Sequence, residues 1–320
     1  MKRLLLSIVL LGYVAGCYAQ QEQQFTQYMI NPFTINPALG GTEDFTDIKV
    51  GYRKQWVHIE DSPQTYYATA HTTLGKEFHT NGYHHRGEHQ SWHGIGGYVY
   101  GDQSGAISRN SFYGQYAFNM PLNRSIRLSI GTFLGLQQYS YDLSGLKRED
   151  LIDSSIPVDR LVNLVPDLSL GFWLYSSNWY IGGAVSQLFN NDINIVSQGD
   201  LNRARLVPHS FITGGVKLLA SEELAVVPSF AFKASSLTSM SLDLNIKLDY
   251  NDQYFGGLSY RSEDAFAIIA GAVINKTLEI SYSYDITTSS LKTVSNGSHE
   301  FILGVRLKHS KHVLCASNFW

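Results

Sequence analysis

The chain has 320 residues and a formal net charge of −3, and only 16% of its residues are charged. Soluble domains usually carry about a quarter of charged residues, and a near-neutral chain lacks the basic face that nucleic-acid binding requires. After the first apolar stretch, no apolar run approaches the length of about 20 residues that a membrane-spanning helix needs. The mean hydropathy of −0.12 still fits a transmembrane β-barrel, because lipid-facing and lumen-facing residues alternate in its strands.

Residues 1–19 have the pattern of an export signal. Two basic residues precede the apolar stretch LLLSIVLLGYVAG, and small residues suit cleavage after Ala19. The VAGC sequence that ends at Cys17 also resembles the site cut before a lipid-modified cysteine, so both processing routes remain open. Cleavage after Ala19 is favoured, because one acyl chain adds only marginal membrane binding. It leaves Cys315 as the single cysteine, and no internal disulfide is then expected.

Residues 20–44 have the composition of an irregular segment. Proline fixes its own φ, lacks a backbone N–H and pushes the preceding residue toward extended backbone, while glycine accepts positive φ. We therefore expect neither a helix nor a regular strand here. The residues concerned are the pairs Asn31-Pro32, Asn36-Pro37 and Gly40-Gly41.

From residue 45 onward the chain divides into fourteen segments of about ten residues in which apolar and polar positions alternate. In SLDLNIKLDY, for example, the leucines and isoleucine lie on one face, whereas Asp243, Asn245, Lys247 and Asp249 lie on the other. This alternation and the even count predict an all-β fold, a transmembrane antiparallel β-barrel of about fourteen strands within residues 45–320. The segments are 45–56, 64–74, 92–102, 109–120, 124–138, 166–176, 178–188, 209–219, 224–235, 240–250, 252–262, 265–274, 276–286 and 299–309.

The connectors between these segments differ in length. Short joins such as PLNR and YND contain turn-forming residues, whereas long connectors occur at 76–91, 138–165, 188–206 and 286–297. Outer-membrane barrels have short turns on one rim and longer loops on the other, so we expect that asymmetry here. Gly131 interrupts its strand pattern and predicts a β-bulge.

Aromatic residues gather near the ends of several segments. They fit the interfacial girdles of a membrane barrel, although they would also fit the core of a soluble β-sandwich, which is the main alternative fold. The export signal, the even strand count and the strand length favour the barrel. The residues are Tyr66, Tyr67, Tyr98, Tyr100, Trp173, Trp179, Tyr282 and Tyr284.

Few residues suggest catalysis or metal binding. The tract from His79 to His93 holds five histidines, but its irregular spacing lacks the paired ligands of a structural zinc site, which favours a solvated loop. No G-x-S-x-G elbow is present, and the serines near His71 and His209 are no more than composition would place there. We expect no enzyme, cofactor or metal site.

Several motifs resemble the PorP/SprF family, outer-membrane proteins of the type IX secretion and gliding system of Bacteroidetes. The resemblance covers essentially the whole chain after the signal. The first motif, FTQYMINPFTINPALGG, contains Gln27, Tyr28, Met29, Asn31, Pro32, Asn36, Pro37, Gly40 and Gly41. Later motifs, in YRKQW, PQTYYATAH and VPDLSLGFW, contain Arg53, Gln55, Trp56, Pro63, Pro166 and Asp167.

The resemblance implies a protein of the bacterial outer membrane that works with type IX secretion. Its expected partner is a large secreted adhesin, held at the cell surface through its C-terminal domain. One branch of the family instead implies a machinery component that links the outer membrane to periplasmic ring lipoproteins and a peptidoglycan-binding protein. A passive porin is a further alternative. We also expect residues 20–42 to fold into or across the periplasmic mouth, with Tyr28, Met29, Phe33 and Pro37 against the wall, because irregular backbone cannot face lipid.

Overall fold

The computed structural model describes residues 25–76, 90–142, 161–194, 203–236, 239–262 and 264–307. The predicted export signal, Cys315 and the histidines from His79 to His89 lie outside these residues. No helix in the described part is long and apolar enough to cross a membrane.

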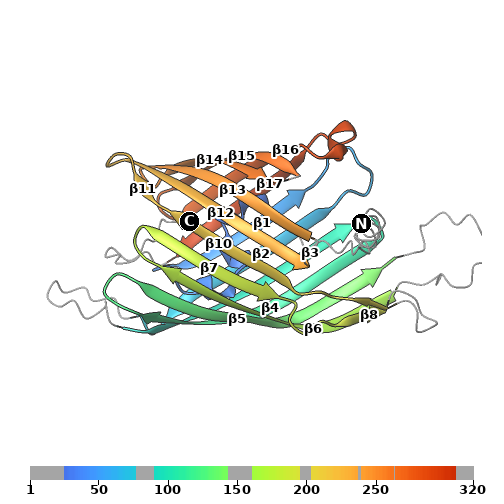
Figure 1. Cartoon of the computed structure of the whole chain (residues 1–320), viewed down its shortest axis with the longest axis horizontal. Coiled ribbons are helices and arrows are strands. Elements are labelled where there is room, and N and C mark those ends of the chain that lie inside the picture. Colours follow the sequence, from blue (N-terminus) through green and yellow to red (C-terminus); the bar gives the residue numbers. More distant parts are fainter. Residues whose placement is uncertain are drawn as a thin grey trace, which may run out of the picture.

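A closed antiparallel barrel dominates the described residues (Figure 1). Each strand pairs with its neighbours along the chain, and the sheet closes where β1 pairs with β17 and where β10 pairs with β12. The fourteen wall strands are β1 (Thr46–Lys54), β2 (Gln64–Leu74), β3 (Trp92–Ser104), β4 (Ile107–Pro121), β5 (Arg127–Tyr141), β6 (Leu161–Tyr175), β7 (Trp179–Ser186), β10 (His209–Val216), β12 (Leu224–Ser236), β13 (Ser239–Tyr250), β14 (Tyr254–Arg261), β15 (Ala265–Ile274), β16 (Leu278–Thr287) and β17 (Ser298–Leu307).

Each predicted segment matches one wall strand, so the predicted strand count and fold are confirmed. The short β11 (Leu218–Leu219) prolongs the pairing of β10 along β12. β8 (Asp192–Asn194) and β9 (Arg203–Arg205) form a separate hairpin.

The wall has an apolar outside and a polar inside. In β13, Ile246 is 51% exposed on the outer face, whereas Asn245 and Lys247 are 3% and 5% exposed on the inner face. Because successive side chains of a strand point to opposite faces, this arrangement repeats around the barrel. The face assignment made from the sequence alternation is therefore confirmed for β13.

The two rims of the barrel differ. We call the end where β1 begins and β17 ends the terminal rim, and the opposite end the loop rim. β8 lies at the loop rim in Figure 1, and β9 pairs with it. Antiparallel strands leave the wall at alternate ends, which places the long connectors after β5, β7 and β16 at the loop rim. The long connector from β2 to β3 emerges instead at the terminal rim. The prediction that all long connectors share one rim is thus wrong for one of the four. The rim of a connector depends on whether the strand before it runs toward the loop rim or toward the terminal rim, and β2 runs toward the terminal rim.

Two expectations about the wall are wrong. No register shift occurs at Gly131, and among the described pairings of β5 and β6 the residue pairs run without interruption. In addition, four of these aromatic residues point into the barrel and are at most 6% exposed, so they are not part of a lipid-facing girdle: Tyr67, Tyr98, Tyr100 and Trp173. Their position in the strand alternation, rather than their nearness to a strand end, decides which way they face.

The barrel lumen is filled by residues 25–44, which we call the plug. It contains three single-turn 3₁₀ helices, η1 (Thr26–Met29), η2 (Pro32–Thr34) and η3 (Pro37–Leu39). The expectation that this segment contains no helix is corrected to this extent. Proline starts η2 and η3, since a first-turn residue needs no bonded N–H and its fixed φ suits the turn. A further 3₁₀ turn, η5 (Ser290–Thr293), lies in the connector between β16 and β17.

Candidate functional site: the plugged lumen

The plug begins in the half of the lumen nearer the loop rim, where Thr26 meets a buried arginine. Arg53 is 1% exposed and donates to the Thr26 hydroxyl at 2.6 Å, to Glu300 at 3.1 Å and to Asp285 at 2.8 Å. The Thr26 N–H also donates to Glu300 at 2.8 Å. Arg53, Asp285 and Glu300 all lie close to the loop-rim ends of their strands, so the plug begins near the loop rim.

More buried charges surround this contact. Arg261 lies 3.5 Å from Asp243 and 2.8 Å from Asp264, and Lys233 pairs with Asp243 at 2.7 Å. Buried ions are tolerated only when they are paired and hydrogen-bonded. This charge network therefore connects β12, β13, β14, β16 and β17 with one another and with Thr26 at the start of the plug.

The residues after Thr26 fill the centre of the lumen. Gln27 donates to the Glu300 carbonyl at 2.8 Å and accepts from the Ser281 hydroxyl at 2.6 Å. Asn245 donates to the Tyr28 hydroxyl, and burial together with Asp243 raises the pKa of Tyr28 above its ordinary value. Each polar side chain of η1 thus has a partner in the wall.

Apolar contacts complete this part of the plug. The Phe33 ring stacks on His71 with centroids 4.5 Å apart and meets Phe133 edge-on at 5.2 Å. Met29 is 7% exposed, and Pro32 is also buried. The Asn31 side chain donates to the Thr69 hydroxyl at 3.1 Å, so the first Asn-Pro pair is bound to β2.

The second Asn-Pro pair binds a different part of the wall. The Asn36 side chain caps η3 by accepting from the Ala38 N–H at 3.0 Å. Its amide donates to the carbonyls of Phe172 and Gly183 at 3.0 and 3.3 Å, and Gln115 donates to the Pro37 carbonyl at 2.6 Å. The second Asn-Pro pair thus anchors the plug to β4, β6 and β7.

Glycines in the wall make this approach possible. A Cβ on Gly131 would lie 2.5 Å from the Pro37 oxygen, and a Cβ on Gly171 would lie 2.1 Å from the Asn36 amide oxygen. Such distances are too short for any side chain. Gly131 is therefore explained by the plug rather than by a bulge.

The plug leaves the lumen along β3. Gly41 has a φ of +74°, which L residues rarely adopt, and a Cβ on Gly94 would lie 1.9 Å from the Gly40 oxygen. The indole N–H of Trp92 donates to the Gly41 carbonyl at 2.7 Å, and Lys76 pairs with Asp44. The Gly-Gly pair thus turns the chain tightly against the wall before β1 begins.

A second group of charges lies toward the terminal rim. Lys49 donates to the Ile30 carbonyl and to Asp47, both at 2.9 Å, and lies 3.8 Å from Glu279. Arg306 pairs with Glu279 at 2.6 Å. This second group consequently holds the plug at Ile30, in addition to the contact at Thr26.

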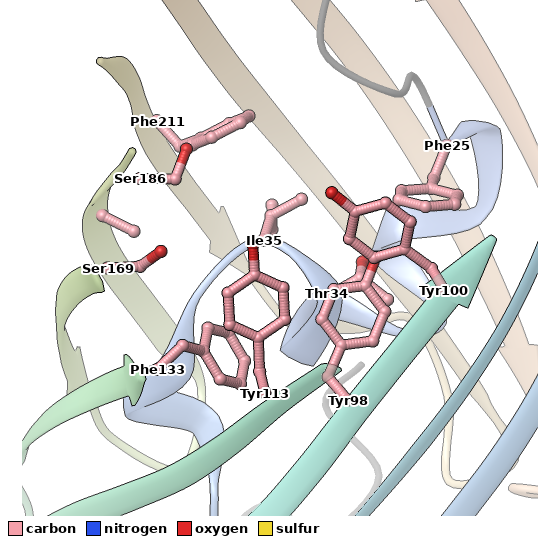
Figure 2. Close-up of a pocket in the computed structure, with 11 residues that line it drawn as sticks. Phe25, Thr34, Ile35, Tyr98, Tyr100, Tyr113, Phe133, Ser169, Ser186 and Phe211 are labelled. Carbon is pink, nitrogen blue, oxygen red and sulfur yellow. The ribbon is translucent and has the colours of Figure 1, made fainter. Parts of the chain in front are cut away.

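A cavity lies beside the plug, on its loop-rim side (Figure 2). Its empty volume is about 490 Å³, the open side included. We call it the aromatic cavity. It is lined by Phe25, Thr34 and Ile35 of the plug and by Tyr98, Tyr100, Tyr113, Phe133, Ser169, Ala184, Ser186 and Phe211 of the wall.

The remaining motif residues lie elsewhere. Gln55, Trp56 and Pro63 belong to the connector between β1 and β2 at the loop rim, where the Gln55 N–H donates to the Pro63 carbonyl at 2.9 Å. Pro166 lies on the exposed face of β6. Asp167 faces inward and accepts from Tyr113 at 2.8 Å. The structure brings the first motif and Arg53 together, but it does not bring these residues into the same contact.

The sequence reasoning missed the partners of Arg53. Asp285 and Glu300 are 259 and 274 residues from Thr26 in the chain, and only barrel closure brings them to it. The only sequence signal for Asp285 and Glu300 was the alternation of their strands, which places both residues on the inner face. Alternation marks a residue as inward, but it does not say which inward residues meet.

The described residues include buried histidines and carboxylates, such as His71 and Asp47. Within them, no group of three or more His, Cys, Asp or Glu side chains is placed to hold a metal ion. The one described histidine of the His-rich tract, His93, makes a 2.7 Å hydrogen bond with the Tyr116 hydroxyl.

A closed barrel with an apolar outer face and a filled, polar lumen defines the class of outer-membrane β-barrel proteins. Within that class, the sequence model of the family described as "Type IX secretion system membrane protein PorP/SprF" matches residues 17–305. The chain belongs to this family. No curated protein matches the chain.

Solved structures show the same fold at low sequence identity. The toluene transporter TbuX of Ralstonia pickettii is 9% identical with a TM-score of 0.51, over 87% of this chain and 93% of that one. A deletion mutant of TodX, described as a monoaromatic hydrocarbon channel, is 11% identical with a TM-score of 0.51, over 86% and 93% of the two chains. At such identity the likeness concerns the fold alone.

Proposed function

We propose that this protein is a non-enzymatic docking barrel of the type IX secretion system. In this proposal it holds a large secreted adhesin at the cell surface through the adhesin's C-terminal domain. Membership of the type IX family supports the pathway. The proposal includes export by residues 1–19 and an outer-membrane location in which the loop rim faces outward.

The filled lumen is the observation that carries the proposal. Residues of η1, η2 and η3 in the plug are buried inside the barrel. Polar groups of the plug form hydrogen bonds with β17 on one side of the barrel and with β6 on the other. A passive porin needs a continuous water-filled lumen, which this plug opposes. A barrel that does not conduct is suited to present its rims to another protein.

Purification of the tagged protein from native outer membranes in mild detergent, followed by mass spectrometry, tests the partner. A large secreted protein recovered in near-equal amount is the expected result. Recovery of ring lipoproteins and a peptidoglycan-binding protein without such cargo would instead select the machinery branch of the family. The tagged protein lacking its export signal serves as the control for contacts made after lysis.

Planar-bilayer recordings test the closed lumen separately. The intact protein is expected to conduct poorly, whereas a variant lacking residues 26–40 is expected to form an open pore. A difference in migration between unheated and heated samples of the variant on a denaturing gel would show that it still folds. Steady, large conductance of the intact protein would contradict the docking proposal and favour a porin.

A further inference from the structure

The aromatic cavity has the character of a ligand site that the docking proposal does not use. Tyr98, Tyr100, Tyr113 and Phe133 stand around one side of it, as Figure 2 shows, with neighbouring ring centroids 5.2 to 6.3 Å apart. Aromatic rings attract a further ring at centroid separations of about 4.5–7 Å, edge-on or offset. The cavity therefore offers several partners to one incoming ring.

The charges of the residues that line the cavity restrict the charge of a possible ligand. Among the described residues that line it there is no Asp, Glu, Lys or Arg. Much of the surrounding lumen is charged, as the contacts of Arg53 and Arg261 show. A charged ligand would lose its hydration in this cavity without gaining an ion pair there. The lining thus selects an uncharged ligand.

Polar groups on the far side allow one hydrogen-bonding substituent. Ser169 of β6 and Ser186 of β7 lie across the cavity from the tyrosine rings (Figure 2), and a serine hydroxyl can both donate and accept. Ligand pockets typically combine apolar walls with a few such groups. The enclosed part of the cavity is much smaller than its total empty volume, which limits the ligand to a single ring.

We propose that the aromatic cavity binds one uncharged, phenol-sized aromatic ring. The ring can belong to a free small molecule or to a Tyr or Phe side chain of a polypeptide that enters from the loop rim, since both present the same chemistry. The inference stands on the lining alone and does not depend on the docking function.

Fluorine NMR of 4-fluorophenol with the full mature protein in lipid nanodiscs tests the site. The expected result is a saturable shift, with a dissociation constant on the order of 0.1 to 1 mM for so small a ligand. Unlabelled phenol is expected to displace it. A shift that rises linearly and equals that of empty nanodiscs would overturn the proposal.

Two neighbouring residues of β7 provide matched variants. Ala184 is 6% exposed and lines the cavity, whereas Val185 is the next residue and points to the opposite face of the strand. Ala184→Trp is expected to weaken binding at least tenfold, and Val185→Trp less than twofold. Unchanged binding by folded Ala184→Trp would overturn the proposal. If Ala184→Trp does not fold, the displacement of 4-fluorophenol by phenol on the unaltered protein still tests the proposed site.

The source of the ring is resolved with a second probe. N-acetyl-3-fluorotyrosinamide carries a peptide group on each side of the residue, as a side chain within a polypeptide does. Saturable binding of this probe at the same site assigns the ring to a polypeptide, whereas binding of 4-fluorophenol alone assigns it to a small molecule. Saturable binding of neither probe rejects the site. The pull-down of secreted cargo is expected to be unaffected by Ala184→Trp if the cavity serves small molecules.

Discussion

Arg53 holds the start of the plug, and replacing it tests whether the buried charges fix that segment. The Arg53→Met change keeps much of the apolar stem and removes the guanidinium group. The structure shows three hydrogen bonds from this group, to Thr26, Glu300 and Asp285, at 2.6, 3.1 and 2.8 Å. The two carboxylates are 0% and 2% exposed, so water does not replace the lost cation.

The expected loss follows from what remains around the carboxylates. Removing one partner of a buried ion pair costs about 3–5 kcal/mol, because the other charge stays buried without compensation. Glu300 keeps the Thr26 N–H at 2.8 Å, and Asp285 keeps the Thr26 hydroxyl at 2.6 Å and Arg261 at 3.9 Å. These remaining partners place the loss near the lower value, about 3 kcal/mol.

Equilibrium unfolding in urea, with the protein folded in lipid vesicles, measures this loss. Lys54→Met is the matched control, because it removes one cation from the adjacent position of β1, which is only partly buried. Exposed charges contribute about 0–1 kcal/mol, so the control is expected to change little. Adding Glu300→Gln to Arg53→Met is expected to recover about 1 kcal/mol or more by removing an unpaired charge.

The result that would refute this reasoning is specific. If Arg53→Met and Lys54→Met lower the free energy of unfolding equally, by less than about 1 kcal/mol, then water reaches the pair and the plug is not held by buried charge. No recovery in the double variant would show that Glu300 is not the group left unpaired.

Two further predictions concern the lumen and the outer face. A Cβ on Gly94 would lie 1.9 Å from the Gly40 oxygen, whereas a Cβ on Gly114 would meet no atom nearer than 3.9 Å. Gly94→Ala is therefore expected to lower the free energy of unfolding in urea by about 1–3 kcal/mol, and Gly114→Ala is expected to change it little. Equal effects of the two variants would contradict the close approach of the plug to β3. Ile246→Arg, on the outer face at mid-strand, is expected to cost about 2–4 kcal/mol in lipid vesicles, and a negligible change would argue that this face does not meet lipid.

Much of the wall could be predicted from sequence because period-two alternation is a local property. Leu244 and Asn245 differ in their faces whatever the rest of the chain does. The same local logic predicted an irregular segment at Asn31-Pro32 and Asn36-Pro37, since proline restricts its own backbone and that of its neighbour. It failed at Gly131, where a missing side chain serves a contact with Pro37 that is distant in sequence.

The sequence by itself therefore determined the strands, their inner and outer faces and the irregular character of residues 25–44. Only the tertiary structure decided that this segment runs deep into the lumen, that Arg53 meets Asp285 and Glu300, and that six aromatic residues line one cavity. The physical reason is that alternation depends on the backbone of a single strand, whereas these contacts exist only after the sheet closes. Closure joins β1 to β17 and brings together residues more than two hundred positions apart.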